Sequence, residues 1–371
     1  MAKEKTNNCW VEIDLPAIRH NLREIKEIVG KNTSLMPVVK SEAYGHGASE
    51  VAKICQKEGV ESFAVATVGE GVNLRKSGIT GEILVLYNTR KEEVADALKY
   101  DISISLFKRN LAEKLNNEAA KQKKVAKVHI PVDTGMGWYG LSSDETLEFI
   151  DYVSSLKYIK IDGIYSHFSK TKSKKFSENQ IQTFRSIIKT LEGRGITANF
   201  HLAKSSGVIA YDKSHMNMVR PGLMLYGIQP QDTHHTNVNL KPAMSFKTRV
   251  FQVRDLPKDT PISYDGTFVT KRDSKAAILP IGYSNGLSRY LSNRGEAIIR
   301  GKKFPIIGNI CMNITIIDVT DDPTVKEEDE VTLMGKDGSM EITADNIADK
   351  VNTTCYEILT SIGSRNQRIY R

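Results

Sequence analysis

Residues 159–203 read IKIDGIYSHFSKTKSKKFSENQIQTFRSIIKTLEGRGITANFHLA, and the fold class follows from their pattern. An apolar, β-branched run at Ile159–Tyr165 is typical of a buried strand, and Asn199–Ala203 is a second such run. Between the two runs, apolar residues recur at helical spacing from about Glu178 to Leu191. A strand, a helix and a strand in this order predict a parallel β–α–β unit.

The same alternation extends from residue 10 to about residue 227. Further strand patterns share a short apolar run: Leu35–Val39, Phe63–Ala66, Ile83–Leu86, Ile102–Leu106, Val125–Val132 and Met218–Leu225. One intervening helix has Pro16 in its first turn and Gly30 as a stop, and another has capping-box spacing at Ser177 and Gln180. Eight strands alternating with helices predict a (β/α)8 barrel, with a doubly wound parallel sheet as the alternative. No glycine-rich dinucleotide motif supports that alternative.

After Lys241-Pro242 the pattern changes to strands without long helices between them. These strand patterns are Phe246–Val253, Ala276–Leu279, Glu296–Ile299, Phe304–Ile307, Ile314–Asp318 and Glu330–Met334. Turn signals separate them, and one helix is expected at Thr343–Lys350. We therefore predict an α/β chain with a barrel at residues 8–240 and a mostly-β domain at residues 241–371.

Composition narrows the class of protein. The chain has 371 residues, of which 40% are hydrophobic and 26% are charged, and this excludes disorder and a coiled coil. No apolar run approaches the ~20 residues of a membrane span, and the N-terminus lacks a signal-peptide pattern. The four cysteines have neither metal-site nor disulfide spacing, so we expect reduced thiols, no metal and a cytoplasmic location.

The net charge of +8 permits attraction to anions without specifying one. The densest basic run has no interleaved aromatic residues, and it consists of Lys170, Lys172, Lys174 and Lys175. Such a run is more typical of a solvated loop than of a nucleic-acid interface. No nucleic-acid partner is therefore expected.

The carboxyl ends of barrel strands are where function gathers, and five residues lie at such ends. They are Lys40, Asp133, His167, Ser205 and Arg220. Lys40 follows the apolar run Met36–Val39, so its amine is carried at the tip of a buried strand. Such a lysine either pairs with a carboxylate or, when desolvated, serves as a Schiff-base nucleophile, and the residues alone leave both interpretations open.

The segment around Lys40, VVKSEAYGHG at residues 38–47, resembles the pyridoxal-phosphate lysine motif of the alanine racemase family. Further segments resemble motifs of the same family, in the same order and over nearly the whole chain: residues 10–15, 64–79, 132–137, 166–168, 219–227, 262–264 and 308–312. The resemblance implies an N-terminal barrel with a C-terminal β domain (fold type III), pyridoxal 5'-phosphate as cofactor and a small amino acid as substrate.

The resemblance also implies a two-base racemase. Lys40 would hold the cofactor through an imine and act as one base, and Tyr264 would act as the second base on the opposite face. His167 would hydrogen-bond toward that tyrosine, and Arg220 would face the pyridine nitrogen of the cofactor. In the family the tyrosine enters from the partner subunit, so a homodimer with composite sites is expected.

Neutral groups are expected to bind the cofactor's phosphate. By the resemblance, these are the hydroxyls of Tyr44 and Ser205 and the backbone amides of Gly222 and Leu223. Dipoles of this kind suit a dianion. Tyr226, in the same segment as the two amides, is also assigned to the cofactor site.

The sequence departs from the family at positions that bear on the substrate. Trp138 stands where the family usually has an arginine, and Pro131 stands where a carbamylated lysine commonly holds that arginine. Substrate carboxylate binding is then expected from the Met312 amide and Asn313. Ser364 stands where the family generally has a tyrosine, which predicts a roomier and more polar pocket.

The resemblance makes alanine the first expected substrate, and the change at Ser364 makes serine or a broader range of amino acids the second. Two further functions fit the same fold: a decarboxylase of this fold type, and a protein that binds the cofactor without catalysing a reaction. The segments around Lys40 and Tyr264 fit a racemase better than a decarboxylase. The presence of Tyr264 on a full β domain argues against a protein that only binds the cofactor.

Overall fold

The computed structural model describes residues 8–233 and 238–371, and the chain divides into two compact units. Pro16–Ala43 and Ala48–Lys241 form what we call the barrel unit. The stretch ending at Leu15, together with Tyr44–Gly47 and Pro242–Arg371, forms the β unit. The domain limits 8–240 and 241–371 stay predictions, because the division seen here groups two short N-terminal stretches with the β unit.

Within the described residues the barrel unit contains an eight-stranded parallel sheet. Its strands, in spatial order, are β2 (Ser34–Leu35), β9 (Met218–Arg220), β8 (Asn199–Lys204), β7 (Ile159–Tyr165), β6 (Ala126–Pro131), β5 (Ser103–Ser105), β4 (Glu82–Val85) and β3 (Ser62–Val65). A bridge between Val38 and Ala64 joins the two ends of this order, so the sheet is nearly closed. The (β/α)8 barrel is confirmed, and the doubly wound sheet is not found.

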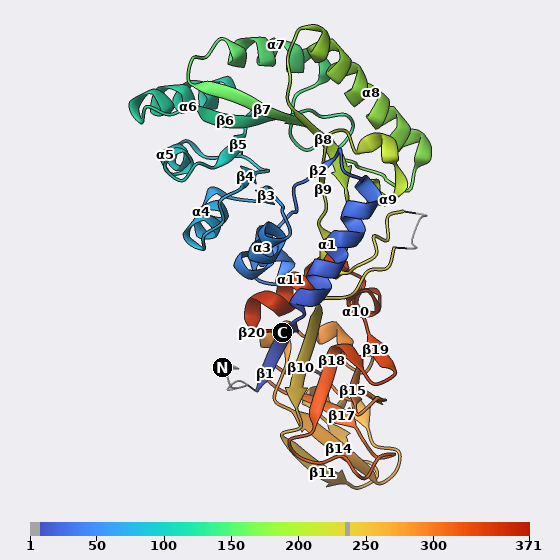
Figure 1. Ribbon diagram of the computed structural model, residues 1–371. Helices are drawn as coiled ribbons and strands as arrows, with labels where there is room; N and C mark the ends of the chain where they lie inside the picture. The colour runs from blue at the N-terminus through green and yellow to red at the C-terminus, as the bar shows by residue number, and fades with distance from the viewer. Residues whose placement is uncertain (1–7, 234–237) are drawn as a thin grey trace. The chain divides into compact units, whose positions relative to one another are not determined.

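Helices follow the strands and lie on the outer side of the sheet (Figure 1). They are α1 (Leu15–Val29), α3 (Ala48–Lys57), α4 (Val68–Lys76), α5 (Val94–Lys99), α6 (Arg109–Lys121), α7 (Ser143–Ser154), α8 (Lys174–Gly193) and α9 (Ser205–Ala210). In α1, Ile18, Leu22 and Ile25 are fully buried, as their helical spacing predicts. Gly30, with φ of 73°, follows the last residue of α1 in the left-handed conformation that suits glycine.

Two details of the barrel differ from the prediction. Helix α8 begins at Lys174, so Ser177 and Gln180 are buried inside it and do not cap it. The Gln180 side chain instead donates to the His167 carbonyl at 3.0 Å. Strand β9 ends at Arg220, because Pro221 lacks an N–H for the ladder, and residues 223–226 form a 3-10 turn.

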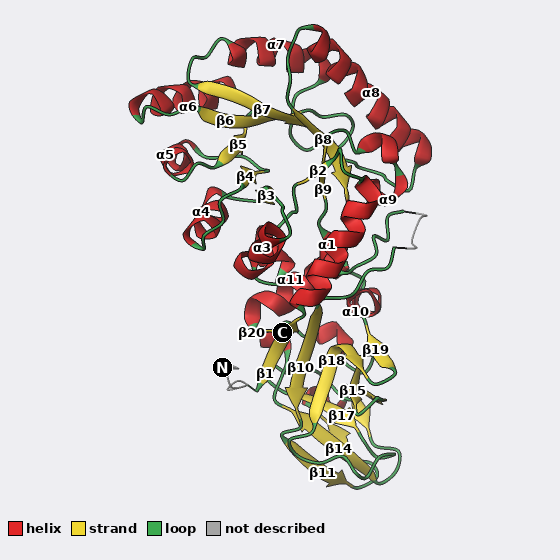
Figure 2. Cartoon of the chain, in the orientation of Figure 1, coloured by secondary structure: helices red, strands yellow, loops and turns green. Residues whose placement is uncertain are grey.

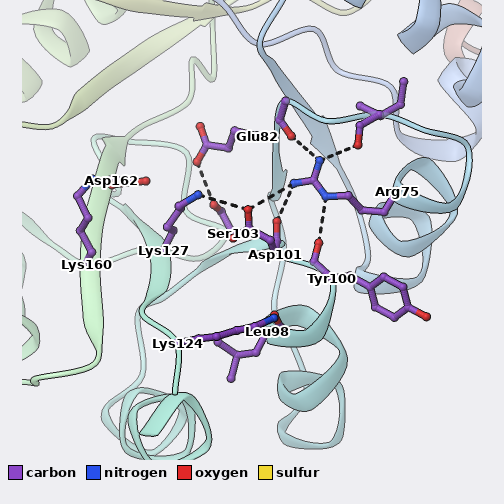
Figure 3. Close-up of polar contacts among 12 residues, drawn as sticks. Arg75, Glu82, Leu98, Tyr100, Asp101, Ser103, Lys124, Lys127, Lys160 and Asp162 are labelled. Carbon is purple, nitrogen blue, oxygen red and sulfur yellow. Dashed lines mark hydrogen bonds and ion pairs between the residues drawn. The ribbon is translucent and has the colours of Figure 1, made fainter. Parts of the chain in front are cut away.

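The amino ends of the barrel strands carry a polar cluster around Arg75 (Figure 3). The Arg75 side chain is 14% exposed and donates at 2.5–3.0 Å to the backbone carbonyls of Ile79, Gly81, Tyr100 and Asp101. A planar guanidinium suits this role because its N–H groups point in several fixed directions. Arg75 therefore ties the segment before β4 to the segment before β5.

The β unit is built mainly from strands (Figure 2). Its larger sheet orders as β16 (Lys302–Pro305), β15 (Glu296–Ile299), β18 (Glu330–Asp337), β10 (Met244–Arg249), β1 (Cys9–Ile13) and β20 (Gln367–Tyr370), with β19 (Met340–Ile342) pairing to β18. Smaller sheets join β11 (Gln252–Leu256), β14 (Ser274–Leu279) and β17 (Thr315–Asp318), and join β12 (Pro261–Ile262) with β13 (Phe268–Val269). The run predicted as one strand at Phe246–Val253 is two strands, β10 and β11.

Two helices, α10 (Ala344–Val351) and α11 (Cys355–Arg365), follow the strands of the β unit, and α10 matches the predicted helix. In β1, the carboxylate of Glu12 contacts Lys247 Nζ at 3.1 Å and Arg371 Nη2 at 3.0 Å. Burial alone would raise the pKa of Glu12, but hydrogen bonds from Arg371, Trp10 and Lys247 lower it to about 2. None of the helices in residues 8–233 and 238–371 has the length and apolar character needed to cross a bilayer.

Candidate active site

Lys40 stands at the start of a backbone turn of unusual hand. The next four residues, Ser41 to Tyr44, have φ values of 52–55°, although none of them is glycine. Each such residue costs roughly 1–2 kcal/mol, and strain of this kind concentrates at functional sites. The Glu70 carboxylate holds the turn, because it accepts from the Ser41 amide at 2.8 Å and from the Ala66 amide at 2.7 Å.

The Lys40 amine is half-buried and donates to the Tyr87 hydroxyl at 2.6 Å. It also lies 4.8 Å from the centre of the Tyr87 ring. No carboxylate of the described residues pairs with it, so the ion-pair interpretation finds no partner among them, and the nucleophile role of Lys40 stays a prediction. Sequence reasoning missed Tyr87, although its position two residues after β4 places it at the carboxyl end of a barrel strand.

Arg220 ends β9 and is 2% exposed. Its Nη1 contacts His201 Nδ1, and its Nη2 donates to the Ser166 carbonyl at 2.6 Å and to His167 Nδ1 at 3.3 Å. The guanidinium carbon lies 5.1 Å from the centre of the Tyr165 ring. Among the described residues nothing accepts a hydrogen bond from the remaining donor, Nε–H.

The charge states of Arg220 and His167 follow from their surroundings. Burial lowers the pKa of Arg220 to about 10, which still leaves it a cation at neutral pH. Burial lowers the pKa of His167 well below its ordinary value, and the charges of Arg220, Lys204 and Lys40 lower it further. His167 is therefore neutral. Because its Nδ1 accepts from an arginine, which only donates, its proton lies on Nε2.

The ring of Trp138 lies nearly parallel to the imidazole of His167. The centres of the two rings lie 6.3 Å apart, and the angle between their planes is 17°. Trp138 is 64% exposed. The loop that carries Trp138 is fixed by the carboxylate of Asp133, which accepts from the backbone amides of Gly135, Met136 and Gly137 at 2.8–2.9 Å. Asp133 thus has a structural use at its barrel-end position.

Ser205, the first residue of α9, lies at the carboxyl end of β8. Its Oγ accepts from the Gly222 amide at 2.9 Å and from the Met224 amide at 3.3 Å. Within the part of the chain that the structure describes, its hydroxyl proton has no acceptor. Leu223, which follows Gly222, is buried at the start of a 3-10 turn. Ser205 thus offers a free donor beside the glycine-containing turn.

The two tyrosines predicted for the cofactor site have different surroundings. Tyr226 is fully buried, and its hydroxyl donates to the Val38 carbonyl at 2.7 Å, two residues before Lys40. Tyr44 ends the left-handed turn and groups with the β unit, where its ring centre lies 5.6 Å from that of Tyr356. Tyr226 therefore supports the strand that carries Lys40.

Tyr264 is 73% exposed, and no hydrogen bond to its hydroxyl occurs within the described residues. Its backbone is held firmly: Asn309 Nδ2 donates to the Tyr264 carbonyl at 2.9 Å. The preceding Ser263 has φ of 62° and donates through its Oγ to the Asn309 carbonyl at 2.6 Å. The turn thus presents a free phenol on a fixed backbone.

Three more predicted residues lie in the β unit. Met312 is 56% exposed, and its amide N–H has no acceptor in the described ranges, whereas its carbonyl accepts from the Ser284 amide at 3.1 Å. Asn313 Nδ2 donates to Ser284 Oγ at 2.7 Å. Ser364 is exposed near the end of α11, where its hydroxyl donates to the Ser361 carbonyl at 3.4 Å.

Family models match both parts of the chain. The N-terminal domain of alanine racemase matches residues 13–230, and the C-terminal domain of alanine racemase matches residues 243–370. The chain belongs to the alanine racemase family. The family and the fold class predicted from the sequence are thereby confirmed.

Relatives and solved structures agree with this family assignment. The chain is 42% identical to alanine racemase 2 of Caldanaerobacter subterraneus subsp. tengcongensis, covering 97% of this chain and 94% of that protein. It is 41% identical to the alanine racemase of Halothermothrix orenii, covering 100% and 99%. The alanine racemase of Clostridium difficile 630 superposes with a TM-score of 0.94 at 33% identity, covering 99% of this chain and 97% of that chain.

The alanine racemase of Bartonella henselae was solved with covalently bound pyridoxal phosphate. It superposes with a TM-score of 0.87 at 29% identity, covering 98% of this chain and 100% of that chain. The barrel unit of the present chain fits such a group, because it offers an amine without a carboxylate partner and the unused donors Arg220 Nε–H and Ser205 Oγ–H. The barrel unit thus brings together Lys40, His167, Arg220 and Ser205, while the roles of all the site residues stay predictions.

Proposed function

We propose that the chain is a pyridoxal-phosphate-dependent racemase that interconverts L- and D-alanine, with Lys40 as the residue that holds the cofactor. The observation that carries this proposal is the half-buried Lys40 amine on a strained turn, without a carboxylate partner among the described residues. Family membership supports the activity, because the relatives and structures named above are alanine racemases. When bound, pyridoxal phosphate supplies the electron sink that stabilises negative charge at the substrate's α-carbon.

Arg220 sets the protonation of the cofactor's ring. Its Nε–H is the donor left over after Nη1 and Nη2 have bound His201, Ser166 and His167. A guanidinium stays protonated and only donates, so a ring nitrogen facing it must remain an unprotonated acceptor. Arg220 thereby weakens the electron sink and limits side reactions. The hydroxyl of Ser205 is the donor proposed for the phosphate, with Tyr44, Gly222 and Leu223 as further contacts and Tyr226 as support.

Racemisation requires a base on each face of the α-carbon. Lys40 Nζ moves the proton on one face, and the Tyr264 phenol moves it on the other. Lys40 lies in the barrel unit and Tyr264 in the β unit, where its hydroxyl is exposed. The neutral imidazole of His167 has its Nε2–H free to donate to the phenol oxygen and to stabilise its ionised form.

The substrate carboxylate is assigned to the β unit. The amide N–H of Met312 has no acceptor among the described residues, and the Asn313 side chain lies beside it. Trp138 takes the place of the family arginine, and its ring lies nearly parallel to that of His167. We expect no carbamylated lysine, because Pro131 occupies the position where that lysine would stand.

The proposal includes a homodimer with composite sites, in which Tyr264 of the partner subunit meets Lys40 of the first. An exposed phenol on a fixed turn suits insertion into a second copy of the chain.

The activity is tested by following deuterium uptake at the α-carbon from heavy water, over a panel of L- and D-amino acids. Both enantiomers of alanine should exchange, and each should convert to the other. Borohydride reduction of the purified protein should attach a pyridoxyl group, and peptide mass spectrometry should locate it on Lys40. Absence of exchange with alanine, or labelling of another lysine, would refute the proposal.

The second base and the dimer are tested with two inactive variants, K40A and Y264F. Y264F should still exchange the α-hydrogen of one enantiomer while losing racemisation. Mixing equal amounts of the two variants, after dissociation and reassociation, should restore about a quarter of the parent activity. Half of the dimers are then hybrids, and each hybrid contains one intact composite site. No recovery of activity would show that Lys40 and Tyr264 act within one chain.

A different activity would give different products in the same panel. A serine-preferring enzyme would exchange serine faster than alanine, and a decarboxylase would release carbon dioxide. No feature of the comparisons favours either one, since the relatives named above are alanine racemases. The amino-acid panel therefore distinguishes all three activities.

A further inference from the structure

A column of polar side chains crosses the interior of the barrel unit, a space that Val, Ile and Leu usually fill in this fold. It begins at Arg220, the last residue of β9, and continues through His201 in the middle of β8 and His129 in the middle of β6. It ends at Glu82 and Ser103, the first residues of β4 and β5. The column thus links the carboxyl ends of the strands, where the candidate site lies, to their amino ends.

Each step of the column is a hydrogen-bond contact. Arg220 Nη1 contacts His201 Nδ1, His201 Nε2 lies 2.8 Å from His129 Nδ1, and His129 Nε2 lies 3.0 Å from Glu82 Oε1. The Ser103 hydroxyl donates to the same carboxylate oxygen at 2.9 Å (Figure 3). Both histidines are fully buried, so water cannot replace a lost partner without entering the barrel.

The chemistry of the two ends fixes the position of every proton between them. Arginine only donates, so His201 Nδ1 must be the acceptor and the proton of His201 must lie on Nε2. That Nε2–H donates to His129 Nδ1, which therefore carries no proton. The proton of His129 must then lie on its Nε2, where it donates to Glu82. Both histidines are neutral, and all three bonds run from the cation toward the carboxylate.

The column also separates two opposite charges. Among the described residues no carboxylate pairs directly with Arg220, and Glu82 is the carboxylate that terminates the chain of bonds leading from it. Burial alone would raise the pKa of Glu82, but the hydrogen bonds from His129 and Ser103 outweigh it and lower the pKa. Glu82 is therefore ionised at neutral pH and can accept both bonds.

The barrel backbone leaves space for this column. Gly163, in the middle of β7, faces His129, and a Cβ at that position would lie 2.2 Å from His129 Nδ1. The pairing of β6 with β7 also shifts register between Val128 and His129. The missing side chain at Gly163 and the local register shift together leave room for the imidazole of His129 inside the barrel.

We propose that Glu82 is a positioning residue for the reaction: as the terminal acceptor, it fixes the tautomers of His129 and His201 and thereby holds Arg220 with its Nε–H free for the cofactor. The inference rests on the proposed function, since it assigns Arg220 to the cofactor ring. Without an acceptor at residue 82, the proton of His129 is better placed on Nδ1. That N–H would face the Nε2–H of His201, so the proton of His201 would have to move to its Nδ1. The Nδ1–H of His201 would then face the guanidinium of Arg220, which can only donate.

The test uses the full-length protein with its histidines labelled with 15N, with and without pyridoxal phosphate. E82L removes the acceptor, whereas E82Q keeps a carbonyl oxygen as acceptor and removes the charge. D101N is the matched control: Asp101 lies at the same end of the barrel, in contact with Lys127 at 3.4 Å, and its side chain is 65% exposed. The readouts are the ring nitrogen shifts and N–H exchange of the eight histidines, the cofactor dissociation constant, and kcat and KM for alanine.

In the parent protein, His129 and His201 should both show protonated Nε2 and slowly exchanging ring N–H groups. E82L should alter both signals, weaken cofactor binding and lower kcat about 10- to 100-fold, with KM changed less than about threefold, because a displaced donor affects the reacting geometry more than substrate binding. E82Q should keep the parent tautomers and a kcat within about threefold. D101N should match the parent in all readouts.

The proposal is overturned if E82L leaves both histidine signals unchanged, or if E82Q loses as much kcat as E82L. H129F serves if E82L does not fold, because it keeps a ring of similar size beside Gly163. H129F should expose the His201 N–H to faster exchange and lower kcat like E82L, and a kcat within about threefold of the parent would overturn the proposal. The spectra of the cofactor-free protein report the column even if the parent fails to racemise alanine, so failure of the proposed function is recognised separately.

Discussion

Gly163→Ala tests whether the barrel is built around the imidazole of His129. The added methyl group would lie 2.2 Å from Nδ1 and 2.4 Å from Cε1 of that ring, far inside contact distance. The ring cannot turn aside freely, because Nδ1 and Nε2 are bound to His201 and Glu82. Overpacking a core costs about 1–3 kcal/mol, and loss of buried hydrogen bonds adds roughly 1–3 kcal/mol.

We therefore expect G163A to lower the free energy of unfolding by about 2–6 kcal/mol. At about 2–4 °C per kcal/mol for a domain of this size, the melting temperature should fall by about 4–24 °C. The assay is differential scanning calorimetry of the barrel transition in the cofactor-free protein. Gly193→Ala is the control, because a Cβ there meets no atom within 4 Å and alanine favours a helix.

A double variant isolates the clash from other effects of the substitution. Removing the ring with H129A also removes the obstacle, so G163A/H129A should be no less stable than H129A alone. The two substitutions would then be coupled by about 2–6 kcal/mol, which is the full cost of G163A alone. Two results would refute the reasoning. One is additive losses of stability in the double variant. The other is a G163A melting temperature within about 1 °C of the parent's, which is the precision of the assay.

Three other outcomes are expected. In a urea titration, R75M should lower the free energy of unfolding by about 2–4 kcal/mol, because it leaves the carbonyls around Arg75 without their donor. The control R109A removes only a half-exposed ion pair and should cost less than about 1 kcal/mol. Folding lowers the pKa of Glu12, so its contribution of about 2–3 kcal/mol to the free energy of unfolding is present above pH 4.5 and is lost as the pH falls toward 2. In E12Q the melting temperature should therefore depend less on pH between about 4.5 and 2 than it does in the parent. S364Y should lower kcat/KM for serine relative to alanine by about threefold or more, and an unchanged ratio would contradict the roomier pocket.

Much of the fold was predictable from the sequence because its strands are short apolar runs that alternate with amphipathic helices. Strand β7 has the predicted bounds, and the other barrel strands except β2 and β9 lie within two residues of theirs. The start of α8 was wrong because Ser177 and Gln180 have cap spacing yet are used for tertiary packing. Local spacing cannot distinguish those two uses, since only the fold brings Gln180 to the His167 carbonyl.

The positions of two candidate residues were predictable from the sequence, while their roles stay predictions. Lys40 and Arg220 both stand at the ends of apolar strands, and the structure places them in the barrel unit as expected. The left-handed turn after Lys40 could not be predicted from the propensities of its residues, because none of them is glycine. Long-range contacts of the surrounding barrel, including the Glu70 bonds, supply what the local sequence lacks.

The polar column was missed for a different reason. His129 and His201 are 72 residues apart, and each stands inside an apolar strand pattern in which a lone histidine reads as a core residue. Their inward position on alternate barrel strands could have indicated that they pair, because burying a polar side chain is costly unless it has a partner. Gly163, inside the strand between them, was a second signal.

The column also gives a physical reason for an arginine at residue 220. One guanidinium there donates to His201, to backbone carbonyls and to His167, and still keeps Nε–H unused. A lysine has its three donors on one nitrogen, so it cannot donate hydrogen bonds to partners that lie as far apart as these do. If Arg220 faces the cofactor's ring as proposed, a lysine would satisfy either the column or the ring nitrogen, and the other would be left without its donor. The geometry of the fork, beyond its charge, therefore joins the interior of the barrel to the chemistry at its mouth.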